Sequence, residues 1–269
     1  MRSSIKWSLV IVIGLALVPA SVAYNGSYSP GEGINGTPHD MSRAANGMNY
    51  TAVPADQLNR ICVFCHAPHN AYRLSTAAGT GAGPVAPDSY DYLPLWNHAL
   101  PDVNPAYTMY ENGPGAPAVG PKASQAVLNG MTPGSTSLLC LSCHDGSIAV
   151  NEYGNVDQPA LSVSHGTTRM TTSYQIGKDM YLGNHHPIGF NYDDAQLMDT
   201  EIRSADSAML TPTTFVRDHL YGNGTASLEC ATCHAVHNKG NTGEKLLWRS
   251  DQNSELCLTC HDKGVYTAP

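Results

Sequence analysis

Every cysteine in this 269-residue chain falls in one of four C-x-x-C-H motifs, and no other feature constrains the fold as strongly. In such a motif the two thiols add to the vinyl groups of a haem, and the imidazole that follows takes one axial position on the iron. Paired cysteines are also typical of zinc sites and disulfides, but neither explains a histidine after every second cysteine. The motifs therefore predict four covalently bound haem c groups. The thioether residues are Cys62, Cys65, Cys140, Cys143, Cys230, Cys233, Cys257 and Cys260, and the proximal iron ligands are His66, His144, His234 and His261.

The N-terminus reads as a secretory signal peptide over residues 1–23. Arg2 and Lys6 precede an apolar stretch that is too short for a convincing membrane span, and a small-x-small cleavage pattern ends at Ala23. Haem attachment to thiols takes place outside the bacterial cytoplasm, which agrees with export. We expect an exported protein without a membrane span, located outside the cell or on its surface, with the periplasm as the alternative.

The charge balance is acidic. The chain has 14 Lys+Arg and 22 Asp+Glu, a net charge of −8; without Arg2 and Lys6 the basic count falls to 12 and the net charge is −10. Such a surface repels nucleic acid and anionic lipid, so neither is expected as a partner. It suits other redox proteins, especially basic ones, or extracellular electron acceptors such as polyvalent metal cations.

Apolar residues in regular runs are scarce. The chain has three phenylalanines against 25 glycines and 18 prolines, too little for a conventional core of this size. We expect mostly irregular coil with a few short helices at the attachment motifs and at 123–129, under a third helix, and very little strand. Haem faces would supply much of the buried apolar surface, at about 25 cal/mol per Å². The core is thus predicted to be packed on haem, and the haem-free chain to be unfolded.

An internal repeat divides the chain into two related dihaem units. Residues 62–70 and 230–238 both read as a C-x-x-C-H motif followed by a second histidine and an asparagine. Each half then has a tryptophan and closes on a Cys-His-Asp motif, with Trp96 and Asp145 in the first half and Trp248 and Asp262 in the second.

This repeat sets the predicted organisation of the mature chain. We expect an N-terminal arm over 24–58, a first unit with haems 1 and 2 over 59–150, and a second unit with haems 3 and 4 over 151–269, all in one compact domain. The glycine- and proline-rich stretch 71–92 fits no motif, and its role stays open.

Eight further histidines are available for the sixth position on each iron, so bis-histidine ligation is expected at all four haems. His69 and His237 lie three residues after a proximal ligand, which on one helical turn puts both rings on one face. Each would then reach a neighbouring iron, His69 that of haem 2 and His237 that of haem 4.

The other two distal ligands are less determined. Pro187 disfavours helix at His186, which suits an extended segment presenting that ring to haem 3. For haem 1 both His39 and His98 are candidates. His165 and His219 lie in polar loops and are expected to be surface residues.

An iron with both axial positions filled by histidine exchanges electrons without binding substrate, so the chain is predicted not to be an enzyme. A multihaem reductase, which needs an iron with a vacant axial position, is the weaker alternative.

The order of these motifs and their flanks resembles the tetrahaem extracellular cytochrome filaments of metal-reducing bacteria (the OmcE type), a branch of the doubled C-x-x-C-H multihaem cytochromes. The resemblance covers most of the mature chain. It implies a coil-rich protein with haems in alternating parallel-stacked and T-shaped contacts, polymerised head to tail. It also implies that His39, on the N-terminal arm, completes a haem of the next subunit, with His98 serving within its own chain. A monomeric periplasmic electron shuttle is the alternative.

Overall fold

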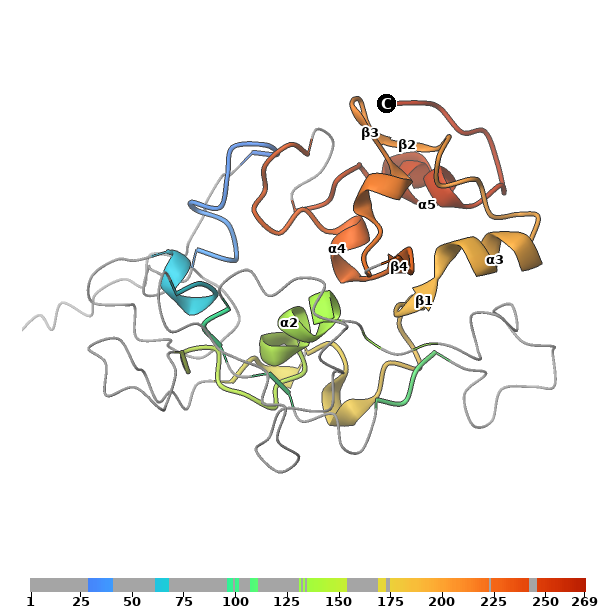
Figure 1. The fold of residues 1–269 in the computed structure, drawn as a ribbon. Helices are drawn as coiled ribbons and strands as arrows, with labels where there is room; N and C mark the ends of the chain where they lie inside the picture. The colour runs from blue at the N-terminus through green and yellow to red at the C-terminus, as the bar shows by residue number, and fades with distance from the viewer. Residues whose placement is uncertain are drawn as a thin grey trace, which may run out of the picture.

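Figure 1 shows the fold in a computed structural model. Several sequence expectations lie outside the residues it describes: the signal peptide, the stretches 71–92 and 123–129, His69 and His165. The structure describes residues 29–40, 61–67, 96–98, 100–101, 107–110, 131, 133, 135–153, 169–172, 175–222, 224–241 and 246–269.

Each attachment motif lies on, or at the end of, a short helix, as predicted. A single helical turn brings two cysteines three residues apart onto one face, which is the spacing that one haem needs. In the first, third and fourth motifs the histidine N–H closes that turn by donating to the carbonyl of the first cysteine, at 2.7, 3.1 and 2.9 Å. The four helices are η1 (Cys62–Phe64), α2 (Ser135–His144), α4 (Cys230–Cys233) and α5 (Glu255–Cys260).

The other elements are equally short. The α3 helix begins after Asn191, whose side chain accepts the N–H groups of Asp193 and Asp194. Two antiparallel pairs, β1 with β4 and β2 with β3, are the named strands of the described residues. The expectation of few short helices and little sheet is thus confirmed for the described part. These elements are η4 (Lys178–Met180), β1 (Phe190–Asn191), α3 (Tyr192–Met198), β2 (Met209–Thr211), β3 (Thr214–Phe215), η5 (Val216–His219), β4 (Ser227–Leu228) and η6 (Gln252–Ser254).

Two larger apolar clusters and a small one, Phe64 with Tyr153, form the core of the described residues, and all three border attachment cysteines. One gathers residues of β1, α3, β2, η5 and β4, with Trp248, Leu256 and Cys260 packed against it. The other larger cluster joins α2 to Trp96, Tyr107 and Leu182, with Cys65 at its edge. Within the described residues, no helix is long and apolar enough to cross a membrane.

The N-terminal segment 29–40 is docked on the loop that follows α4 (Figure 1). The N–H of Gly33 donates to the carbonyl of Asn238 at 2.8 Å, and the Asn238 amide donates back to the Gly33 carbonyl at 3.1 Å. Gly31 has a φ of +79°, and a Cβ there would lie 3.1 Å from the Asn241 carbonyl oxygen. Glycine at this position therefore permits both the turn and the close contact.

Candidate haem-binding sites

The four thiol pairs are chemically available. All eight cysteines are free thiols, so the disulfide alternative is not realised in the structure. Among the described residues, which include every cysteine, no three His, Cys, Asp or Glu side chains converge on a common metal position. A bis-histidine haem needs only two protein ligands to its iron, because the porphyrin supplies the other four.

Three motif histidines each have one further histidine ring at a distance that leaves room for one iron atom between the two rings. Ring centroids are 6.2 Å apart for His39 and His144, 6.0 Å for His66 and His237, and 6.2 Å for His186 and His261. A bond from an imidazole nitrogen to a metal is about 2 Å long, so two rings on opposite sides of one iron have centres roughly 6 Å apart. The residues present thus fit an iron bound between each pair.

Hydrogen bonds at Nδ1 orient the rings for such a role. The Nδ1 atoms of His39, His186 and His234 lie 3.3, 2.9 and 3.3 Å from the carbonyl oxygens of Val236, Pro187 and Leu246, in that order. A carbonyl only accepts, so each Nδ1 carries the proton and each Nε2 presents its lone pair. Metal-bound histidines in proteins typically have this arrangement.

Burial lowers the pKa of several of these histidines and so favours the neutral ring, the form that binds a metal. Burial, followed by the neighbouring His39 and His234, lowers the pKa of His144 to about 4. Burial is also the largest cause that lowers the pKa of His39, and it lowers those of His237 and His261, where the facing ring adds to the effect.

His98 and His219 have the opposite orientation. The Nε2 of His98 is 2.9 Å from the Ala149 carbonyl oxygen, and that of His219 is 2.8 Å from the Thr214 hydroxyl. Both rings are buried, and His219 packs on Trp248 with ring centroids 4.5 Å apart. The surface location expected for His219 is therefore wrong: an aromatic neighbour 29 positions away in the sequence covers it. His98 lies 3.6 Å from the Cys143 sulfur rather than facing a motif histidine.

The ring pairs differ from the pairing expected from the sequence. His237 faces His66 of the first motif, not the fourth, and His186 faces His261 of the fourth motif, not the third. His39 faces His144 of the second motif within the same chain. The expected pairing assumed that each half of the chain is self-contained, whereas the pair of His66 and His237 joins the two halves.

Cysteines of successive motifs are also neighbours. Next to burial, which is the largest cause, the proximity of Cys143 helps to raise the pKa of Cys65 to about 12. The Cys140 and Cys230 thiols hydrogen-bond to each other, which raises the pKa of Cys140. Along the chain these interactions therefore run from motif 1 to 2 and from 2 to 3. Cys260 in turn contributes, after burial, to the raised pKa of Cys233, which extends the series to motif 4.

Buried polar groups around the motifs also match a cofactor that carries carboxylates. Trp96 Nε1, Thr136 Oγ1 and Arg249 Nε are buried and have no hydrogen-bond partner in the described part of the structure. Trp96 lies edge-on to His66, with ring centroids 6.2 Å apart, and Thr136 is one helical turn before Cys140. Haem propionates are the acceptors that such donors would bind.

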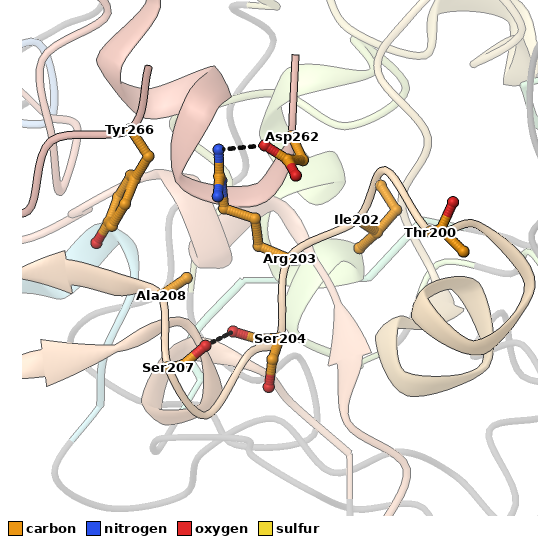
Figure 2. A pocket seen from close by; sticks show the side chains of 8 residues that line it. All are labelled: Thr200, Ile202, Arg203, Ser204, Ser207, Ala208, Asp262 and Tyr266. Carbon is orange, nitrogen blue, oxygen red and sulfur yellow. Dashed lines mark hydrogen bonds and ion pairs between the residues drawn. The ribbon is translucent and has the colours of Figure 1, made fainter. Parts of the chain in front are cut away.

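The aspartates that follow the second and fourth motifs both anchor their segments. Asp145 accepts a 2.6 Å hydrogen bond from Tyr107, and Asp262 pairs with Arg203 at 2.6 Å. Figure 2 shows Arg203 and Asp262 on one wall of a shallow pocket beside the fourth motif, with Tyr266 near the guanidinium. The Arg203 guanidinium lies 5.2 Å from the centre of that ring, so it holds the C-terminal segment against the motif. Sequence reasoning missed Tyr107 and Arg203, because only the matching aspartates carried a signal.

Comparison with known proteins bears on the C-terminal part of the chain. No curated protein matches the sequence. Residues 224–265, which hold the third and fourth motifs, match the family described as "Doubled CXXCH motif". The match, together with two more motifs of the same form, supports a multihaem c-type cytochrome with covalently bound haem c, acting in electron transfer.

Proposed function

We propose that this protein is a tetrahaem cytochrome that conducts electrons through bis-histidine irons. The observation that carries the proposal is the set of three imidazole pairs with ring centroids 6.0 to 6.2 Å apart, each containing one motif histidine. Haem iron held by two imidazoles cycles between ferric and ferrous states and carries one electron. Since both axial positions are taken, the protein has no place to bind a substrate on iron, and we propose that it is not an enzyme.

The order of contacts supports a continuous path. In each pair of successive motifs one cysteine helps to raise the pKa of another: Cys143 that of Cys65, Cys230 that of Cys140, and Cys260 that of Cys233. Because each thiol would be bonded to a haem edge, neighbouring thiols imply neighbouring macrocycles. The polypeptide would hold the edges of neighbouring haems in contact and shield them from water. Electrons would enter at one end of this series and leave at the other.

The third iron needs a distal ligand as well, and we propose His69 for it. In the sequence His69 occupies the place after the first motif that His237 occupies after the third. His237, which follows the third motif, faces the histidine of the first motif. If His69, which follows the first motif, in turn binds the third iron, both irons have a distal ligand. This replaces the sequence expectation that His69 serves haem 2.

We further propose that the protein is exported and forms a head-to-tail filament by exchange of its N-terminal arm. The contacts of residues 29–40 with the loop after α4 need not be made within one chain. The 20 residues 41–60 connect the arm to the first motif, and extended they span at most about 70 Å. A neighbour's His39 could thus face His144, and an interface of this kind, which does not close, produces a fibre.

The experiment uses the purified, haem-loaded protein. Intact mass should give four haems per chain, and the oxidised protein should have only low-spin, six-coordinate iron. Fewer attached haems, or a high-spin signal in the resting protein, would contradict a conductor and revive the reductase alternative. Size measurement and electron microscopy separate the filament from the monomeric shuttle: fibres that disappear when residues 29–40 are deleted support arm exchange, and a monodisperse monomer contradicts it.

A further inference from the structure

One buried carboxylate lies at the contact between the second and third motifs. Glu229 directly precedes Cys230, and 2% of its surface is exposed. Its Oε1 accepts a 2.6 Å hydrogen bond from the Ser227 hydroxyl, and its Oε2 accepts one from Ser137 on α2. An ionised carboxylate only accepts, so two hydroxyl donors on its two oxygens match the charged form.

The same group connects the two helices. Ser137 lies one turn before Cys140, and its Oγ also accepts the Cys230 N–H at 3.1 Å. Ser137 Oγ thus accepts one hydrogen bond, from the Cys230 N–H, and donates its own proton in another, to Glu229. The Glu229 N–H in turn is capped by the Thr232 hydroxyl at 2.9 Å. These contacts fix the carboxylate at the junction of α2 and α4, where the Cys140 and Cys230 thiols hydrogen-bond to each other.

We propose that Glu229 is a positioning residue that sets the potentials of haems 2 and 3. A negative charge in a site shielded from water stabilises the ferric over the ferrous form, because reduction adds an electron near that charge. The carboxylate lies next to the cysteines of these two motifs: Glu229 directly precedes Cys230, and its partner Ser137 lies one turn before Cys140. Its effect therefore falls on the middle of the conducting series, where it makes the two central haems harder to reduce.

The inference rests on the proposed haem attachment, and the experiment separates the two. Potentials of the haem-loaded full chain are measured by spectroelectrochemical titration of wild type, Glu229→Gln, Glu229→Asp and Ser137→Ala. Glu255→Gln is the matched control, since Glu255 lies two residues before Cys257 with 44% of its side chain exposed, so that water screens its charge.

Glu229→Gln should move two of the four midpoint potentials upward, by more than any shift in Glu255→Gln, with four haems still attached by mass. Glu229→Asp keeps the charge and should restore both potentials towards wild type. Ser137→Ala removes a hydrogen bond but no charge, so it should raise neither potential. No shift in Glu229→Gln beyond the control, an equal shift of all four haems, or the same upward shift in Ser137→Ala would overturn the proposal. A wild type without four attached haems would instead contradict the proposed function.

Discussion

The ring pair of His66 and His237 leads to a specific spectroscopic prediction. Its two ring planes are 28° apart, whereas the planes of the other two pairs are 81° and 65° apart. Nearly parallel imidazoles donate to iron along the same direction and split its dπ orbitals widely, which gives a rhombic low-spin spectrum. Nearly perpendicular rings leave those orbitals close in energy, which gives a strongly anisotropic low-spin spectrum.

His237→Ala should therefore convert one haem in four to a high-spin form and remove a rhombic component. The assay is electron paramagnetic resonance of the oxidised protein, read as the difference between wild type and variant so that the unchanged haems cancel. His237→Met, which keeps an axial ligand, should instead raise the potential of one haem. His185→Ala is the control: His185 belongs to none of the three pairs, and all iron should stay low-spin.

A difference spectrum of the strongly anisotropic type would refute the assignment of His237 to the first haem. It would place His237 on a haem whose two imidazole planes are steeply inclined. The fourth haem, which the sequence suggested, is such a haem. A variant without any high-spin iron would refute ligation by His237 altogether.

The remaining predictions concern the arm, the core and the cofactor. His39→Ala should produce one high-spin haem in monomer and filament alike, because no copy then has the ring that faces His144; in wild type, high-spin iron that appears only on dilution would point to ligation between copies. Leu210→Ala should cost about 2 to 5 kcal/mol in denaturant unfolding, because Leu210 is 2% exposed within the C-terminal cluster. Leu197→Ala, at a side chain that is 82% exposed, should cost much less. A chain with all eight cysteines changed to serine should unfold without a cooperative transition, and a sharp transition would show that haem is not needed for the core.

Local features were predictable from the sequence and long-range ones were not. The C-x-x-C-H spacing specifies a helical turn at each motif, and scarce apolar runs specify short elements. The partner of His237 depends instead on a contact with the first motif, 171 positions away in the sequence, between loops that carry no periodic signal. The orientation of His98 was also hidden, because both of its ring nitrogens are chemically able to ligate and only the Ala149 carbonyl distinguishes them.

The docked arm has a consequence for biosynthesis. Residues 29–40 leave the ribosome early, but the loop that receives them comes some 200 positions later. Pairings this distant in sequence are slow to form, because the whole intervening chain must first be brought into place. Until that loop is in place the His39 ring has no docking site, so it can bind a newly attached iron other than the one it faces in the folded chain. Maturation must therefore either delay the arm or allow early iron bonds to be exchanged until the last motif is in place.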